Sequence, residues 1–71
     1  MIKKIILRNR SGVELLVMLE PITFQEKISV GGELSITGDF TDSSLTIDIC
    51  EENSVSVWAP PGADLQVEPE K

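Results

Sequence analysis

Residues 45–50 read Leu45-Thr46-Ile47-Asp48-Ile49-Cys50, and apolar and polar side chains alternate strictly along this stretch. A period of two places Leu45, Ile47 and Ile49 on one face of an extended chain and the other three side chains on the opposite face. Such alternation is typical of a β-strand with one face toward a core. We therefore expect a half-buried strand over 44–50.

The same alternation recurs elsewhere, in the pairs Leu34/Ile36, Val55/Val57 and Leu65/Val67. Turn-forming residues separate these pieces, at Gly31-Gly32, at Gly38-Asp39, over 51–54 and at Pro60-Pro61-Gly62. Repeated short strands between turns indicate an all-β fold, either a small antiparallel β-sandwich or a barrel-like domain. We expect one domain over 1–71 with about seven short strands. Their expected ranges are 2–8, 13–20, 23–30, 33–37, 44–50, 55–58 and 63–68.

The segment 13–20 is apolar from Val13 to Leu19 except at Glu14. A continuous apolar run predicts a central strand with both faces covered, one by the opposite sheet and one by another subunit. Pro21 ends it, since proline cannot donate to a ladder. In the next strand Glu26 interrupts the alternation, which indicates a bulge or an exposed edge. The tail 69–71 is expected to fray.

A chain of 71 residues supports only a small core, and this one has few means of reinforcing it. Its single cysteine, Cys50, excludes an intrachain disulfide, and the lack of histidine excludes a zinc site of the usual ligands. Because 41% of the residues are hydrophobic, we expect a homo-oligomer in which a second copy covers an apolar patch. The expected interface residues are Leu16, Met18 and Trp58. The alternative is a compact monomer whose core absorbs these side chains.

The net charge is −6, which disfavours nucleic acid and anionic membrane surfaces as partners. Four of the six basic residues, Lys3, Lys4, Arg8 and Arg10, lie among the first ten. We expect this basic strand to lie beside acidic strands, although a site for an anionic ligand is the alternative. The acidity of the remaining chain supports a second hypothesis, an inhibitor or immunity-type protein that binds a basic partner.

The composition argues against catalysis, since histidine and tyrosine are both absent. Neither a Ser–His nor a Cys–His pair can form, and the sequence has no phosphate-binding glycine loop. We therefore expect a non-enzymatic protein without a cofactor. Cys50 has acidic neighbours that disfavour its thiolate, and a lone thiol suits a reducing compartment, the cytoplasm.

Two further residue groups are candidates for binding. Asp39 and Asp42 lie in the loop 39–44 with several hydroxyl side chains, a set of oxygens that suits a weak Ca²⁺ or small-ligand site. The alternative is a loop whose side chains cap its own backbone. Trp58 has the outward parity of its strand and precedes a proline pair, so it is either an anchor for a partner or a side chain enclosed by the core.

The order of certain signals resembles a pattern in small bacterial all-β proteins. The matching residues are Leu19-Glu20-Pro21, Gly32-Glu33-Leu34, Leu45/Ile47/Ile49, Val55/Val57/Trp58, Pro61-Gly62 and Leu65/Val67. Those proteins often have an aromatic residue soon after Glu-Pro, where this chain has Ile22-Thr23. The resemblance implies a compact β fold and no particular activity.

Overall fold

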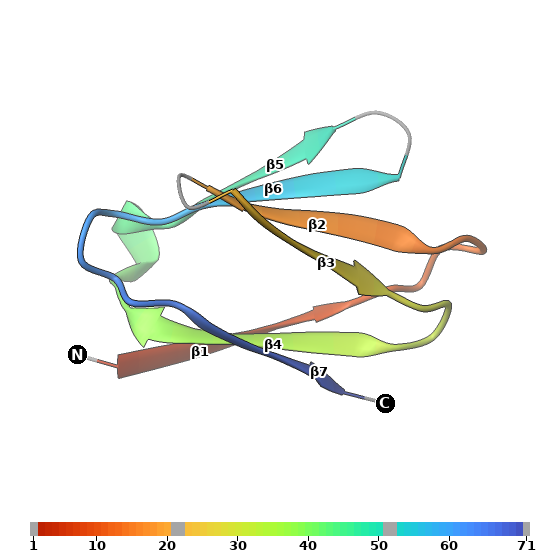
Figure 1. Cartoon of the computed structure of the whole chain (residues 1–71), viewed down its shortest axis with the longest axis horizontal. Helices are drawn as coiled ribbons and strands as arrows, with labels where there is room; N and C mark the ends of the chain where they lie inside the picture. Colours follow the sequence, from red (N-terminus) through yellow and green to blue (C-terminus); the bar gives the residue numbers. More distant parts are fainter. Residues whose placement is uncertain (1, 21–22, 51–52, 71) are drawn as a thin grey trace.

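The computed structural model describes residues 2–20, 23–50 and 53–70, which form two packed β-sheets (Figure 1). The described strands are β1 (Ile2–Arg8), β2 (Leu15–Glu20), β3 (Phe24–Ile28), β4 (Glu33–Asp39), β5 (Thr46–Cys50), β6 (Ser54–Trp58) and β7 (Gln66–Glu70). One short 3-10 helix, η1 (Asp42–Ser44), precedes β5. The prediction of an all-β fold of seven short strands is confirmed.

The smaller sheet has the strand order β1-β4-β7 and the larger sheet the order β3-β2-β6-β5. In the described part of the chain each sheet ends in two unpaired edges, so the fold is an open sandwich and not a closed barrel. Every neighbouring pair is antiparallel except β2 and β6, which are parallel. The predicted antiparallel sandwich thus includes one parallel pair. The chain leaves the larger sheet to form β4, returns to it as β5, and then forms β6 beside β2 in the same direction.

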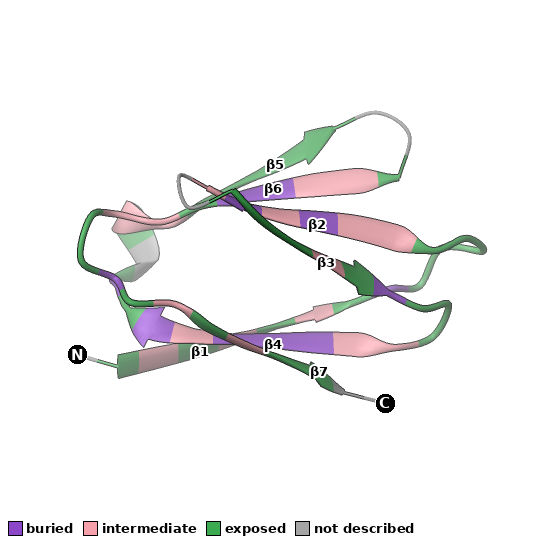
Figure 2. Ribbon diagram, in the orientation of Figure 1, coloured by how far each residue is buried: buried purple, intermediate pink, exposed green. Residues whose placement is uncertain are grey.

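The core lies between the two sheets, where Figure 2 shows buried segments on β2, β4 and β6. Its central cluster of buried side chains comprises Val17, Leu19, Ile28, Leu34, Ile36 and Val57. Phe40 and Ala63 are also buried. The predicted central position of β2 is confirmed, since β3 and β6 flank it. Its burial is one-sided, however, because Val17 and Leu19 are buried whereas Leu16 and Met18 are only half-buried.

Strand boundaries differ from expectation where local geometry intervenes. The strand expected from residue 44 begins at Thr46, because residues 42–44 form η1. Of the tail 69–71 expected to fray, Pro69 and Glu70 instead belong to β7, with Pro69 opposite Leu34, and Lys71 lies outside the described residues. Proline is tolerated there because β7 is an edge strand. β3 is also an edge strand, and its unbroken register through Glu26 selects the exposed edge over the bulge.

Asn9, which directly follows β1, is 2% exposed and joins two loops. Its side-chain NH₂ group donates to the carbonyl oxygens of Val13 at 2.8 Å, Ile28 at 2.9 Å and Ser29 at 3.2 Å. Its Oδ1 accepts from the backbone N–H of Ser11 at 3.0 Å and from the Ser11 hydroxyl at 2.6 Å. Every polar group of the amide therefore has a partner, as a buried polar side chain requires. Asn9, expected as a turn residue, is thus a buried clamp, by which we mean that its side chain holds the two loops together through hydrogen bonds.

The charge arrangement expected for the first strand is also observed. Arg8 on β1 lies opposite Glu33 on β4, and the Arg8 Nε donates to Glu33 Oε2 at 2.7 Å. This one pair matches the cross-strand interpretation, whereas Lys3 and Lys4 lie opposite Gly38 and Thr37.

Candidate functional site

The larger sheet turns one face away from the core, and this outer face carries all three side chains predicted at an interface. On β2 and β6, Met18 lies opposite Ser56 and Glu20 lies opposite Trp58. Leu16 precedes Met18 by two residues, so it has the same orientation. The structure therefore brings Leu16, Met18 and Trp58 onto one surface, which we call the outer patch.

Within the outer patch, Trp58 is the most accessible side chain, at 45% exposed. Because it lies outside the buried core, the alternative in which the core encloses it is excluded. Leu16 and Met18 are half-buried. The neighbouring positions on this face are polar, with serines on β6, Gln25 and Lys27 on β3, and Asp48 on β5. An aromatic anchor among polar neighbours is a common arrangement at protein interfaces.

β5 forms a second accessible apolar surface, at the edge of the larger sheet (Figure 2). All five of its residues are exposed, including Ile47 at 43% and Ile49 at 88%. These two isoleucines lie opposite Val57 and Val55 of β6, so they share the inward face of the sheet. The expectation that this strand is half-buried was therefore wrong, although its alternation and its strand conformation were predicted correctly.

The exposure of β5 follows from the unequal widths of the two sheets. The core and the side chains packed on it come from the other strands and from Leu45 and Leu65, which precede β5 and β7. Figure 1 shows β5 at the edge of the larger sheet farthest from the smaller sheet. The four-stranded sheet therefore extends one strand, β5, beyond the three-stranded sheet that covers it. The inward isoleucines of β5 have no strand of the other sheet opposite them. Nothing in the local sequence distinguishes them from core residues.

Cys50, the last residue of β5, is a free and exposed thiol. Its Sγ lies 3.8 Å from the Asp48 carbonyl oxygen and 3.6 Å from the Ser56 hydroxyl on β6. The contact with Ser56 places Cys50 on the outer face, which matches the polar parity predicted for it. Glu51 and Glu52, the other expected neighbours, lie outside the described residues.

The loop 39–44, which contains the two predicted metal ligands, uses its hydroxyls to hold its own backbone. The Ser44 hydroxyl accepts from the Thr41 N–H at 2.8 Å and donates to the Thr41 carbonyl at 3.0 Å. Asp39 ends β4 and Asp42 begins η1. Within residues 2–20, 23–50 and 53–70, no group of three or more His, Cys, Asp or Glu side chains gathers to hold a metal ion. The observed hydroxyl contacts match the alternative in which the side chains of the loop cap its own backbone. The Ca²⁺ site stays a prediction.

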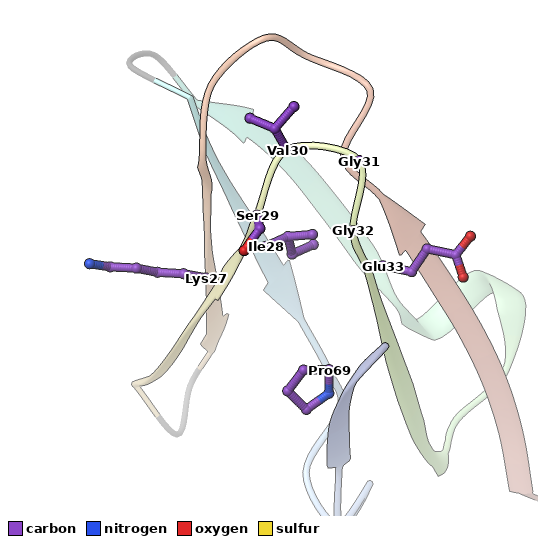
Figure 3. A pocket seen from close by; sticks show the side chains of 8 residues that line it. All are labelled: Lys27, Ile28, Ser29, Val30, Gly31, Gly32, Glu33 and Pro69. Atoms are coloured by element: carbon purple, nitrogen blue, oxygen red, sulfur yellow. The ribbon is translucent and has the colours of Figure 1, made fainter. Parts of the chain in front are cut away.

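An open hollow of about 350 Å³ lies beside the turn between β3 and β4 (Figure 3). The turn 28–32 forms most of its lining, with Pro69 of β7 on the far side and Lys27 and Glu33 at its margins. Lys27 points away from the hollow, and its nearest acidic partner is Glu14, whose Oε1 lies 4.0 Å from Nζ. The hollow therefore shows no convergent set of polar groups of the kind that orients a small ligand.

Four of the described acidic residues divide between two surfaces. Glu33 and Glu68 lie on the outer side of the smaller sheet, whereas Glu20 and Asp48 lie on the outer side of the larger one. Glu33 is already paired with Arg8. These four carboxylates therefore do not share one face, and the basic partner stays a prediction.

Comparisons with protein-family models, with curated proteins and with solved structures found no match for this chain. In the part of the chain that the structure describes, no helix is long and apolar enough to cross a membrane. The interpretation of function therefore depends on the two apolar surfaces of the larger sheet, the outer patch and β5.

Proposed function

We propose that this protein is a self-associating protein-interaction module that acts by binding and not by catalysis. The observation that supports the proposal most directly is Ile49, which is 88% exposed on the inward face of the larger sheet. Burying such a side chain against another apolar surface lowers the free energy, because it removes apolar area from water. Another copy of the same chain is available wherever the protein is present, so self-association is the simplest way to bury Ile49.

The size of the chain supports the same proposal. Among the described residues the central core cluster has only six buried side chains, and no disulfide reinforces it. Association can supply the missing stability, because binding to the folded state alone shifts the folding equilibrium toward it. An exposed lone thiol persists best in a reducing environment, so we propose the cytoplasm as its compartment.

Sedimentation-velocity ultracentrifugation over a range of about 1–100 μM, the span in which weak to moderate dimers dissociate, tests this proposal. We expect the sedimentation coefficient to rise with concentration from the value for one chain to the value for a dimer or a larger closed oligomer. A single monomeric species at every concentration would overturn the proposal. The measurement should be made with reductant, so that Cys50 disulfides do not contribute.

A further inference from the structure

The two sheets have four unpaired edges in the described part of the chain, and three of them carry features that discourage pairing. β1 has Lys3 on its inward face, opposite Gly38, and β3 has Glu26 on its inward face, opposite Val17. Charged side chains that point inward at an edge are a common means of blocking edge-to-edge association. β7 contains Pro69, which lacks an N–H donor.

β5 has none of these features. Its sequence is Thr46-Ile47-Asp48-Ile49-Cys50, without lysine, arginine or proline, and its one charged side chain lies on the outer face. Its inward side chains are the exposed isoleucines. β5 therefore presents an open row of backbone donors and acceptors together with an uncovered apolar face, which is the usual description of a strand that pairs with another chain.

We infer that β5 pairs edge to edge with β5 of a second copy, antiparallel and across a two-fold axis, so that the two larger sheets form one continuous sheet. This inference rests on the proposed self-association and names its interface. The partner is a second copy because the pattern of residues 45–49 is symmetric about Ile47. Leu45-Thr46-Ile47-Asp48-Ile49 is apolar, polar, apolar, polar, apolar in either direction.

The two-fold axis at Ile47 satisfies this symmetry. It places Ile47 opposite Ile47 of the partner subunit and Ile49 opposite Leu45 of the partner subunit. Leu45 has φ −110° and ψ 128°, which is extended backbone, so it can continue the strand to meet that residue. Every directly opposed pair on the inward face is then apolar, and such pairs place their Cβ atoms about 4.5–5.5 Å apart.

The charge on β5 favours the same register. Asp48 is the only charged side chain of the strand. An axis at Asp48 would place it directly against Asp48 of the partner subunit, and like charges in that position destabilise a sheet. The axis at Ile47 instead places Asp48 opposite Thr46 of the partner subunit, whose hydroxyl can donate to the carboxylate.

The first test compares two isoleucine-to-lysine variants by sedimentation velocity. Ile49→Lys introduces a charge on the proposed seam, and Ile2→Lys introduces the same charge on β1, where Ile2 is 69% exposed. We expect Ile49→Lys to weaken dimerisation at least about tenfold and Ile2→Lys to leave it unchanged, because only the former would force a charge into the paired strands. Circular dichroism should confirm that both variants keep the strand spectrum of the parent chain.

The second test uses the native cysteine and needs no substitution. In the proposed register Cys50 lies opposite Ser44 of the partner subunit, so the two Cys50 Cα atoms are separated by about 20 Å at roughly 3.4 Å per residue. A spin label on Cys50 should give one intermolecular distance of that order, lengthened by the two label arms, in a pulsed electron-spin measurement.

The outcomes separate this inference from the proposed function. A parent chain that is always monomeric overturns both. A dimer that tolerates Ile49→Lys but dissociates with Met18→Lys overturns the inference alone and places the interface on the outer patch. A label distance incompatible with about 20 Å between Cα atoms overturns the stated register, even if Ile49→Lys dissociates the dimer.

Discussion

β1 and β5 are both edge strands with alternating side chains, yet their inward faces have different surroundings. On β1, Ile5 and Leu7 pack against the core. On β5, Ile47 and Ile49 occupy the equivalent inward positions and are exposed. The smaller sheet is one strand narrower than the larger sheet, and β5 is the strand that lies beyond it. Alternation therefore identifies which side chains share a face, but the width of the opposite layer decides whether that face is buried.

The largest expected effect tests this difference with one pair of truncations. Ile36 lies opposite Ile5 and is 0% exposed, so Ile36→Ala should reduce the free energy of unfolding by about 2–5 kcal/mol. Ile49→Ala should reduce it by less than about 0.5 kcal/mol, because the side chain contacts little in one chain. Urea unfolding at the lowest workable concentration measures both while limiting the contribution of association. Comparable losses would contradict the exposed position of Ile49.

The next effect concerns the loop that closes the fold beside β1. Asn9→Ala removes three donated hydrogen bonds and leaves the buried carbonyl of Ile28 without this partner. We expect a loss of about 2–3 kcal/mol, since buried unsatisfied groups carry most of the cost. Ser11→Ala is the matched control: it removes the hydroxyl that donates to Asn9 but keeps the clamp, and should cost about 1 kcal/mol or less. Thermal melts compare the two, and a smaller loss for Asn9→Ala than for Ser11→Ala would exclude the clamp.

Much of the fold could be predicted from local patterns, because alternation and turn residues are local signals. The strand Ile2–Arg8 has the predicted bounds, and Leu34, Ile36 and Val57 are buried as their parity indicates. The three interface candidates do share one face, since parity determines orientation. The outward position of Trp58 followed from the same rule.

The remaining features depend on contacts between residues far apart in the chain. The parallel pairing of β2 with β6 has no local signature, and neither does the narrower sheet that leaves Ile49 exposed. Asn9 before Arg-Ser-Gly is an ordinary turn signal. Its role as a clamp depends on carbonyls of Ile28 and Ser29, which only the folded chain brings close. Local patterns therefore predict strands better than they predict which surfaces meet.

A smaller loss of stability is expected at Gly38 of β4, which has little free space around it. A Cβ atom at Gly38 of β4 would lie 2.6 Å from Leu65 Cδ2 and 3.0 Å from the Ala63 carbonyl oxygen. Gly38→Ala should therefore destabilise the protein by about 1–2 kcal/mol, because the Leu65 side chain must shift and the Ala63 carbonyl oxygen leaves the methyl group little room. Gly12→Ala is the control, since a Cβ there meets nothing within 4 Å. Equal melting temperatures for the two variants would show that the sheets are less tightly packed at this end than the distances imply.

The smallest expected effect asks how far the ion pair contributes to holding β1 in place. Arg8 and Glu33 lie at the surface with side chains 52% and 22% exposed, so water and salt screen their attraction. A double-mutant cycle of Arg8→Ala and Glu33→Ala should give a coupling of about 0.2–1 kcal/mol that declines as salt is raised. Unfolding in urea at low and high salt measures it. A coupling energy as large as the loss of unfolding free energy caused by Ile36→Ala would contradict this expectation. It would show that the ion pair, and not burial of the inward side chains, holds β1 in place.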